Sequence, residues 1–159
     1  MKTKKEIKLT NKTKNTLQRH VLVSILPKWA DQILSGAKSW EYRKVAINAE
    51  KGSKLILYAS RKLHAIVGEA TIEKVLIEPV DLLIQHTIKE VPETPDELKK
   101  TFAGKKVGCA IKLKNPTRYP TPLSLNAIRK EIPNFRPPQS FYYVSNDAPL
   151  IRLLTKGNR

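Results

Sequence analysis

The sequence predicts an α+β domain, a small, mostly antiparallel β-barrel with peripheral helices. Short apolar segments bounded by glycine and proline recur along residues 20–159, which is typical of a sheet of short strands. The helical segments between them are too irregularly spaced for the regular crossovers of a parallel doubly wound sheet. A chain of 159 residues that is 40% hydrophobic is long enough for one core and one domain.

Residues 20–85 alternate between β-rich and helical patterns. The expected elements are a strand over 20–25, a helix over 27–35, an extended segment over 38–44, strands over 55–59 and 65–77, and a helix over 79–85. Pro27 suits the first turn of a helix and Gly36 its end. The continuous apolar run over 55–59 indicates a strand buried on both faces. Gly68 inside an apolar strand indicates a bulge or a close approach of the backbone.

The second half of the chain predicts two strands and three helices. These are helices over 96–103, 123–130 and 148–154, and strands over 107–113 and 140–144. Thr94 or Asp96 can cap the first of these helices, and Gly104 closes it. Prolines keep the stretch after residue 113 extended. Cys109 lies in an apolar strand between two small residues, so we expect a core residue rather than a nucleophile.

The net charge is the strongest indication of function. The chain has 30 Lys and Arg against 14 Asp and Glu, which gives a formal charge of +16. An excess of this size favours polyanionic partners through counterion release. Residues 1–19 read as a disordered basic arm, which serves either as a source of phosphate contacts or as a solubility tail. The arm has no apolar face for insertion into a membrane, so nucleic acid is the expected polyanion.

Composition also bounds the chemistry. One cysteine and three histidines without ligand spacing predict neither a disulfide nor a metal site, and no cofactor is expected. The apolar runs are much shorter than the roughly 20 residues of a membrane-spanning helix. A reducing cytoplasm is the expected compartment.

Lys38, Glu41 and Arg43 are the first candidate site residues, because three charges fall within six positions. Arg43 can bind a phosphate through two parallel hydrogen bonds, and Lys38 can act as a point charge on phosphate. Glu41 can orient Arg43 or accept hydrogen bonds from a base edge. The competing interpretation is a surface ion pair between Glu41 and Arg43, which would contribute little.

The segment over 23–44, which reads VSILPKWADQILSGAKSWEYRK, resembles the opening signature of the ASCH domain: S-I-x-P, an alanine, I-L-x-G-x-K and then E-x-R. The later segments LYAS (57–60), AIVGE (65–69) and RPPQSF (136–141) follow in the expected order. The resemblance covers about residues 20–145. It implies a barrel similar to that of pseudouridine-synthase and archaeosine-transglycosylase (PUA) domains, and it implies RNA binding.

The resemblance also implies a cleft that binds nucleic acid or a small nucleoside. The residues it assigns to this cleft are Ser24, Lys38, Glu41, Arg43, Ser60, Glu69, Gln139 and Ser140. Serines at strand ends are common in turns, and alternation along the strand points Glu69 outward, so both alternatives stay open.

Some ASCH relatives are ribonucleases, and others are amidohydrolases that act on modified cytidine. The amidohydrolases use a lysine, a threonine three residues later and a distant glutamate. Lys38 matches the lysine, but Glu41 occupies the threonine position and offers no hydroxyl nucleophile. If the protein is an enzyme, Lys38, Glu41 and Arg43 are its candidate catalytic residues.

We therefore expect an RNA-binding module, with DNA as a second possible partner. An enzyme that acts on RNA or a modified nucleoside is the alternative. An interaction protein with an incidental basic tail is the third hypothesis. The pattern leaves the base preference and the oligomeric state open.

Overall fold

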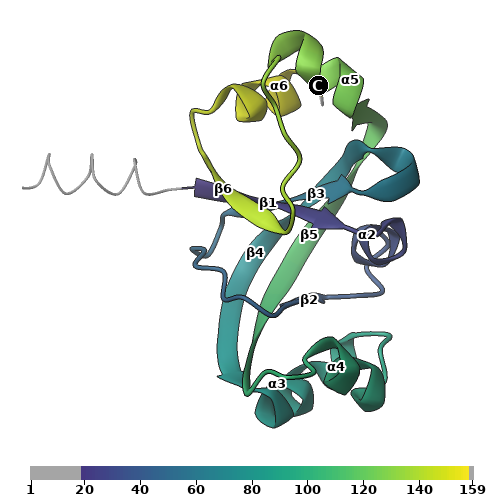
Figure 1. Cartoon of the computed structure of the whole chain (residues 1–159), viewed down its shortest axis with the longest axis vertical. Helices are drawn as coiled ribbons and strands as arrows, with labels where there is room; N and C mark the ends of the chain where they lie inside the picture. Colours follow the sequence, from purple (N-terminus) through teal and green to yellow (C-terminus); the bar gives the residue numbers. More distant parts are fainter. Residues whose placement is uncertain (1–18, 158–159) are drawn as a thin grey trace, which may run out of the picture.

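Six strands form one sheet in the order β2-β5-β4-β3-β1-β6 in the computed structural model, which describes residues 19–157 (Figure 1). The strands are β1 (Arg19–Ile25), β2 (Trp40–Arg43), β3 (Lys54–Ala59), β4 (Ala65–Pro79), β5 (Val107–Ser124) and β6 (Phe141–Ser145). The α-helices are α2 (Pro27–Leu34), α3 (Val80–Thr87), α4 (Pro95–Thr101), α5 (Leu125–Glu131) and α6 (Pro149–Gly157). Two single 3₁₀ turns, η1 (Arg61–Leu63) and η2 (Ile88–Glu90), complete the described elements. The predicted α+β class is confirmed.

The sheet is mostly antiparallel, as the sequence predicts. β1 pairs parallel with β3, and every other ladder among the described strands is antiparallel. Strands β2 and β6 are the two edges, so backbone ladders do not close the barrel. Side chains span this seam instead. The Arg43 guanidinium donates to the Ser24 carbonyl at 3.2 Å, and the Asn48 backbone N–H donates to the Tyr143 hydroxyl at 2.9 Å.

Strands β4 and β5 form a long two-stranded ribbon that crosses the molecule (Figure 1). β4 is one strand over 65–79, which extends the predicted strand over 65–77 by two residues. β5 continues to Ser124, well past the predicted end at residue 113, through three prolines. The β4–β5 register shifts at three places, including the step between Ile66 and Gly68. Prolines fit this strand because an irregular ladder does not require an N–H from every residue.

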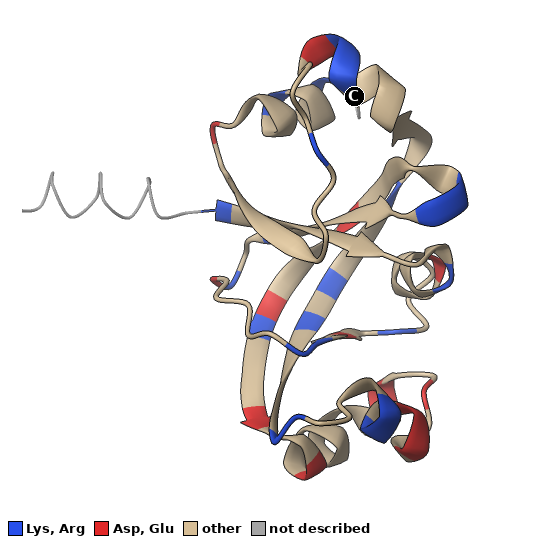
Figure 2. Cartoon of the chain, viewed as in Figure 1, with Lys and Arg blue, Asp and Glu red and all other residues tan. Residues whose placement is uncertain are grey.

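Basic residues are distributed unevenly over the fold. Figure 2 shows Lys and Arg on the loop that contains η1 and in bands along β5, and it shows acidic residues on α4. The side chains of Arg61, Lys62, Lys114 and Arg118 are all exposed in these two regions. The positive charge of these two regions is therefore carried at the surface, where it is open to a polyanion.

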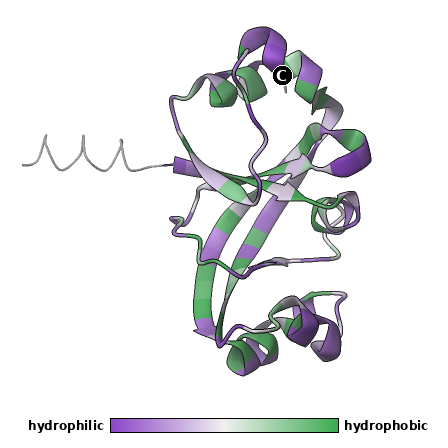
Figure 3. Ribbon diagram, viewed as in Figure 1, coloured by the Kyte–Doolittle hydropathy of each residue, from purple (hydrophilic) through white to green (hydrophobic). Residues whose placement is uncertain are grey.

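The core lies on both faces of the sheet and beneath the helices. Hydrophilic and hydrophobic residues alternate along β4 and β5 (Figure 3), so each strand contributes side chains to more than one buried cluster. One cluster packs α2 against the sheet, a second lies under α5 and α6, and a third under α3 and α4. Cys109 is 1% exposed in the first cluster, so its prediction as a core residue is confirmed. Burial raises the pKa of its thiol.

Three predicted helix ends follow the expected chemistry. Pro27 is the first residue of α2, and Gly36 has a φ of +84° after its end. The Thr94 hydroxyl accepts from the Glu97 N–H, and the Glu97 carboxylate accepts from the Thr94 N–H. This reciprocal capping box fixes the start of α4.

The predicted basic arm lies outside the described residues, except for Arg19. Arg19 begins β1, and its guanidinium lies 3.6 Å from the ring centre of Tyr143. No helix in the described range 19–157 is long and apolar enough to cross a membrane.

Gly68 provides a test of the close packing between β4, β5 and α2. A Cβ at this position would lie 2.5 Å from the Thr117 carbonyl oxygen and 2.7 Å from a Leu34 methyl group. We expect Gly68→Ala to lower the free energy of unfolding by about 1–3 kcal/mol, because the backbone at residue 117 must move. Urea unfolding measures this loss.

Gly157→Ala is the matched control, because a Cβ at the end of α6 meets nothing within 4 Å. If Gly68→Ala lowered the free energy of unfolding no more than Gly157→Ala does, the close approach of β4 to the Thr117 carbonyl would be contradicted.

Candidate functional site

A cavity of about 250 Å³ opens between α2, β2 and the segment that leads into α4. It is lined by Ser24, Ile25, Leu26, Trp29, Lys38, Glu41, Tyr42, Arg43, Glu93, Leu98 and Thr101. The ends of β1 and β2 supply the polar residues on one side, and α2 and α4 supply the walls. Segments that are far apart in the sequence therefore meet around one hollow.

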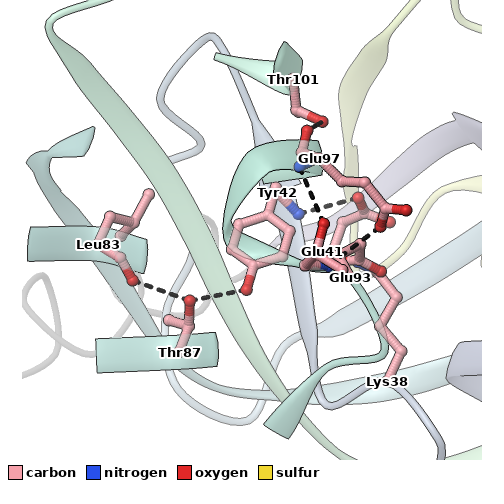
Figure 4. A network of polar contacts seen from close by, with 9 residues as sticks. Lys38, Glu41, Tyr42, Leu83, Thr87, Glu93, Glu97 and Thr101 are labelled. Atoms are coloured by element: carbon pink, nitrogen blue, oxygen red, sulfur yellow. Dashed lines mark hydrogen bonds and ion pairs between the residues drawn. The ribbon is translucent and has the colours of Figure 1, made fainter. Parts of the chain in front are cut away.

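Lys38 and Glu93 form a buried ion pair inside this cavity (Figure 4). The Lys38 Nζ atom lies 2.7 Å from Glu93 Oε2, and the two side chains are only 4% and 5% exposed. Lys38 follows the turn that ends α2, where its backbone N–H donates to the Gln32 carbonyl. Glu93 directly precedes Thr94, so the capping box of α4 fixes its position. A buried charge this close to its partner is held in one place.

Two aromatic rings flank the lysine. The Lys38 Nζ atom lies 4.6 Å from the ring centre of Tyr42 and 5.1 Å from that of Trp29. The Tyr42 hydroxyl donates to the Thr87 hydroxyl at 2.7 Å, and burial raises the pKa of Tyr42 well above its usual range. Tyr42 is therefore neutral at physiological pH and anchored in the core. Trp29 is half-buried and presents the open aromatic wall of the cavity.

Three buried polar atoms around the cavity have no hydrogen-bond partner among residues 19–157. They are Glu41 Oε2, Glu93 Oε1 and Arg43 Nε. The other oxygen of Glu41 accepts the Tyr42 backbone N–H at 2.9 Å. Buried polar atoms are nearly always paired, so three unpaired atoms around one hollow indicate a site that is completed by a ligand or by water.

Arg43 connects the cavity to the seam of the sheet. It donates to the Ser24 carbonyl and makes long contacts of 3.5 Å with the carbonyl and hydroxyl of Ser140. The Ser24 hydroxyl donates to the Pro138 carbonyl. Ser24, Arg43 and Ser140 are thus brought together, as the sequence predicts, but the Ser24 hydroxyl is already engaged by the backbone.

The structure separates three of the predicted residues from this group. The Ser60 hydroxyl donates to the Ile25 carbonyl, behind the cavity wall. Gln139 is exposed and lines none of the described cavities. Glu69 lies in a second hollow of about 500 Å³ with His20 and Lys54.

Glu69 accepts from the Tyr119 hydroxyl at 3.0 Å and lies 3.6 Å from Lys54 Nζ. The long strand β4 carries it away from the first cavity and into the second hollow. Ser60 and Gln139 do not line the first cavity either, and a part of these three residues in ligand binding stays a prediction.

Glu93 is the site residue that sequence reasoning missed. It lies in a segment that the sequence marks only as a proline-containing loop before a capped helix. A buried carboxylate in a loop is a functional signal, but burial becomes visible only in three dimensions. Glu93 lies 55 positions after Lys38 in the sequence and contacts it directly in the structure.

The charges of the cavity nearly cancel. Lys38 and Arg43 carry two positive charges, and Glu41 and Glu93 carry two negative charges. No ion pair joins Glu41 to Arg43, both of which are described, so the surface-pair interpretation is wrong. Lys38 is neutralised by Glu93, which disfavours its expected role as a point charge on phosphate. In the described part of the chain, no cluster of three His, Cys, Asp or Glu is arranged to hold a metal ion.

Comparison with known protein families gives one family assignment. The model of a family described as a domain of unknown function, DUF365, matches residues 21–130, which cover most of the chain and every lining residue of the cavity. The chain belongs to the DUF365 family.

The DUF365 chain is also similar to ASCH proteins. It is 24% identical over 132 residues to an ASCH domain-containing ribonuclease from Zymomonas mobilis, across 82% of this chain and 87% of that protein. A crystal structure of ASCH from Zymomonas mobilis superposes with a TM-score of 0.78 at 22% identity, over 87% of this chain and 95% of that chain.

A crystal structure of human THYN1 in complex with DNA that contains 5-methylcytosine has a TM-score of 0.56 at 11% identity. It covers 89% of this chain and 98% of that chain. The resemblance to ASCH domains and their PUA-like fold is confirmed.

The ion pair of the DUF365 chain predicts a large stability effect. Lys38→Met leaves the Glu93 charge buried without a partner, and we expect a loss of about 3–5 kcal/mol in the free energy of unfolding. The double variant Lys38→Met/Glu93→Leu is expected to recover much of this loss. Urea unfolding of the single and double variants measures the coupling.

Arg118→Ala is the control, because its pair with Asp31 is exposed at 52% and 65%. We expect it to lower stability by less than about 1 kcal/mol. An equal loss in the free energy of unfolding for Lys38→Met and Arg118→Ala would show that the buried ion pair is no more important to stability than the exposed one.

Proposed function

We propose that this protein binds single-stranded RNA, with one base in the cavity and the phosphates on exposed lysines and arginines. The cavity carries the proposal, because it combines an aromatic wall with buried polar atoms that lack partners. A base offers a flat face for Trp29 and hydrogen-bonding edges for the polar atoms. The volume of about 250 Å³ suits one base or nucleoside rather than a longer segment of chain.

A base is a better occupant than a phosphate. Two carboxylates face the cavity, and a phosphate placed among them would meet negative charge. An uncharged base meets no such repulsion and can accept from the Arg43 Nε–H. The backbone of the nucleic acid is better matched by the basic loop at η1 and by β5, which lie on the surface (Figure 2).

The relatives support the same class of ligand. The Zymomonas mobilis relative is named a ribonuclease, and human THYN1 was crystallised with DNA containing 5-methylcytosine. Both proteins act on or bind a polynucleotide, and the formal charge of +16 on this chain fits such a partner. We propose RNA as the ligand, and a comparison of its affinity with that of DNA of the same sequence distinguishes the two.

Binding is expected to depend on salt and on Trp29. Fluorescence anisotropy with labelled single-stranded RNA and DNA across a salt series should show affinity that falls as salt rises, because phosphate contacts release counterions. Trp29→Leu should weaken RNA binding by roughly 5- to 150-fold, the effect of about 1–3 kcal/mol from lost stacking.

Tyr142→Leu is the matched aromatic control outside the cavity. A chain that begins at Arg19 should keep salt-dependent binding. If removal of residues 1–18 abolished all binding, the binding site would lie outside the cavity. The same would follow if the two aromatic substitutions weakened RNA binding equally.

An enzyme that acts on RNA is the second candidate, favoured by the buried Lys38–Glu93 pair and by the ribonuclease relative. In such a reaction the 2′-hydroxyl of the RNA would attack the adjacent phosphorus while the bond from phosphorus to the 5′-oxygen breaks. Glu41 would take the proton of the attacking hydroxyl, and Lys38 would stabilise the negative charge that develops on the phosphoryl oxygens.

We expect any cleavage of RNA, or any deacylation of acylated cytidine, to fall by at least 100-fold in Glu41→Ala. Product formation is followed by gel electrophoresis and by chromatography. Activity that is equal in the wild-type and variant proteins would exclude this cavity as the catalytic site.

A further inference from the structure

The hydrogen bonds within the cavity leave two acceptors unused. Glu41 Oε2 and Glu93 Oε1 are buried without a partner, in residues that are each 7% exposed. A carboxylate in its charged form only accepts hydrogen bonds, so each of these oxygens is open to an N–H or O–H donor of a ligand or of water. Leaving a buried acceptor unpaired is costly, which favours a ligand that supplies donors.

Both oxygens are held in fixed positions. The Tyr42 backbone N–H binds Glu41 Oε1 at 2.9 Å, and Lys38 Nζ binds Glu93 Oε2 at 2.7 Å. Since one oxygen of each carboxylate is engaged, rotation of the side chain would break an existing bond. Figure 4 shows Glu41 and Glu93 converging beside Lys38, so the ligand meets two acceptors in one region.

The bases of RNA differ in what they offer to such acceptors. Adenine, cytosine and guanine each carry an exocyclic amino group with two N–H donors. Uracil carries a carbonyl at the position of the cytosine amino group, and its single N–H lies between two carbonyl oxygens. A carbonyl oxygen directed at a carboxylate is repelled and leaves the acceptor unpaired.

We propose that this cavity selects a base that bears an exocyclic amino group and disfavours uracil. The proposal rests on the proposed function in one respect, namely that a base occupies the cavity. The preference for an amino group over a carbonyl follows from the acceptors of Glu41 and Glu93. A base presents the same amino group in a polynucleotide and in a free nucleoside.

Cytosine and uracil are the sharpest probes, because they have nearly the same size and differ in the group at one ring position. Fluorescence anisotropy at neutral pH compares oligocytidylate and oligouridylate of equal length. Calorimetry compares cytidine with uridine. We expect the cytosine form to bind at least 10-fold more tightly in the polymer, with the same order of preference for the nucleosides.

Glu41→Gln tests the cause of the selection. The amide carbonyl can keep the bond to the Tyr42 N–H, while the NH₂ group faces the cavity and can donate to a carbonyl. The ratio of cytosine to uracil affinity should therefore fall by at least 5-fold. Glu131→Gln, an exposed substitution at the end of α5, should leave the ratio unchanged. Thermal unfolding confirms that both variants fold.

The outcomes separate the two proposals. If oligocytidylate and oligouridylate bind tightly and with equal affinity, the base selection is overturned while RNA binding stands. Tighter binding of oligouridylate has the same two consequences. Cytidine preferred over uridine without binding of either oligomer supports the selection and overturns RNA binding. Absence of binding by all four probes overturns both. An unchanged ratio in the folded Glu41→Gln protein removes Glu41 from the selection.

Discussion

The contact between Lys38 and Glu93 joins the two segments on which the cavity depends. One segment is the turn between α2 and β2, and the other is the loop that leads into α4. Neither segment lies within a ladder, and the ion pair holds them together beside the backbone hydrogen bond from the Ser39 N–H to the Glu90 carbonyl. A buried ion pair gains little net stability over apolar residues of the same volume. Its value is to hold a charged oxygen and an amine at a fixed place in a hollow, which is a requirement of a binding site rather than of a core.

Arg43 shows how the open sheet and the site depend on each other. The edge strand β2 has four residues and, among the described strands, pairs only with β5, so its other side needs a partner. Arg43 reaches across to the carbonyl of Ser24 while it lines the cavity. A change at this residue therefore affects both the seam and the site. Trp29 is a cleaner probe of binding, because it lies on α2 and bridges no strands.

The sequence predicts elements well where a local pattern decides them. Strands β1 and β3 and helix α2 follow from apolar periodicity, from Pro27 and from Gly36. The grouping of Lys38, Glu41 and Arg43 follows from short spacing and from the ASCH resemblance. Glu93 could not be found in this way, because its contact with Lys38 spans 55 positions. Glu69 could not be placed from the sequence either, because only the course of the long strand β4 shows that it lies in another hollow.

The separation of charge in this protein assigns different tasks to its surface and its cavity. Exposed lysines and arginines attract a phosphate backbone without regard to sequence, which supplies affinity and makes it sensitive to salt. The cavity is nearly neutral, so it adds little to that attraction. Under the proposed function, its fixed acceptors instead discriminate between ligands by hydrogen bonding. Glu41 is central to this division, because its buried and unpaired Oε2 atom is an acceptor that the edge of a base can meet.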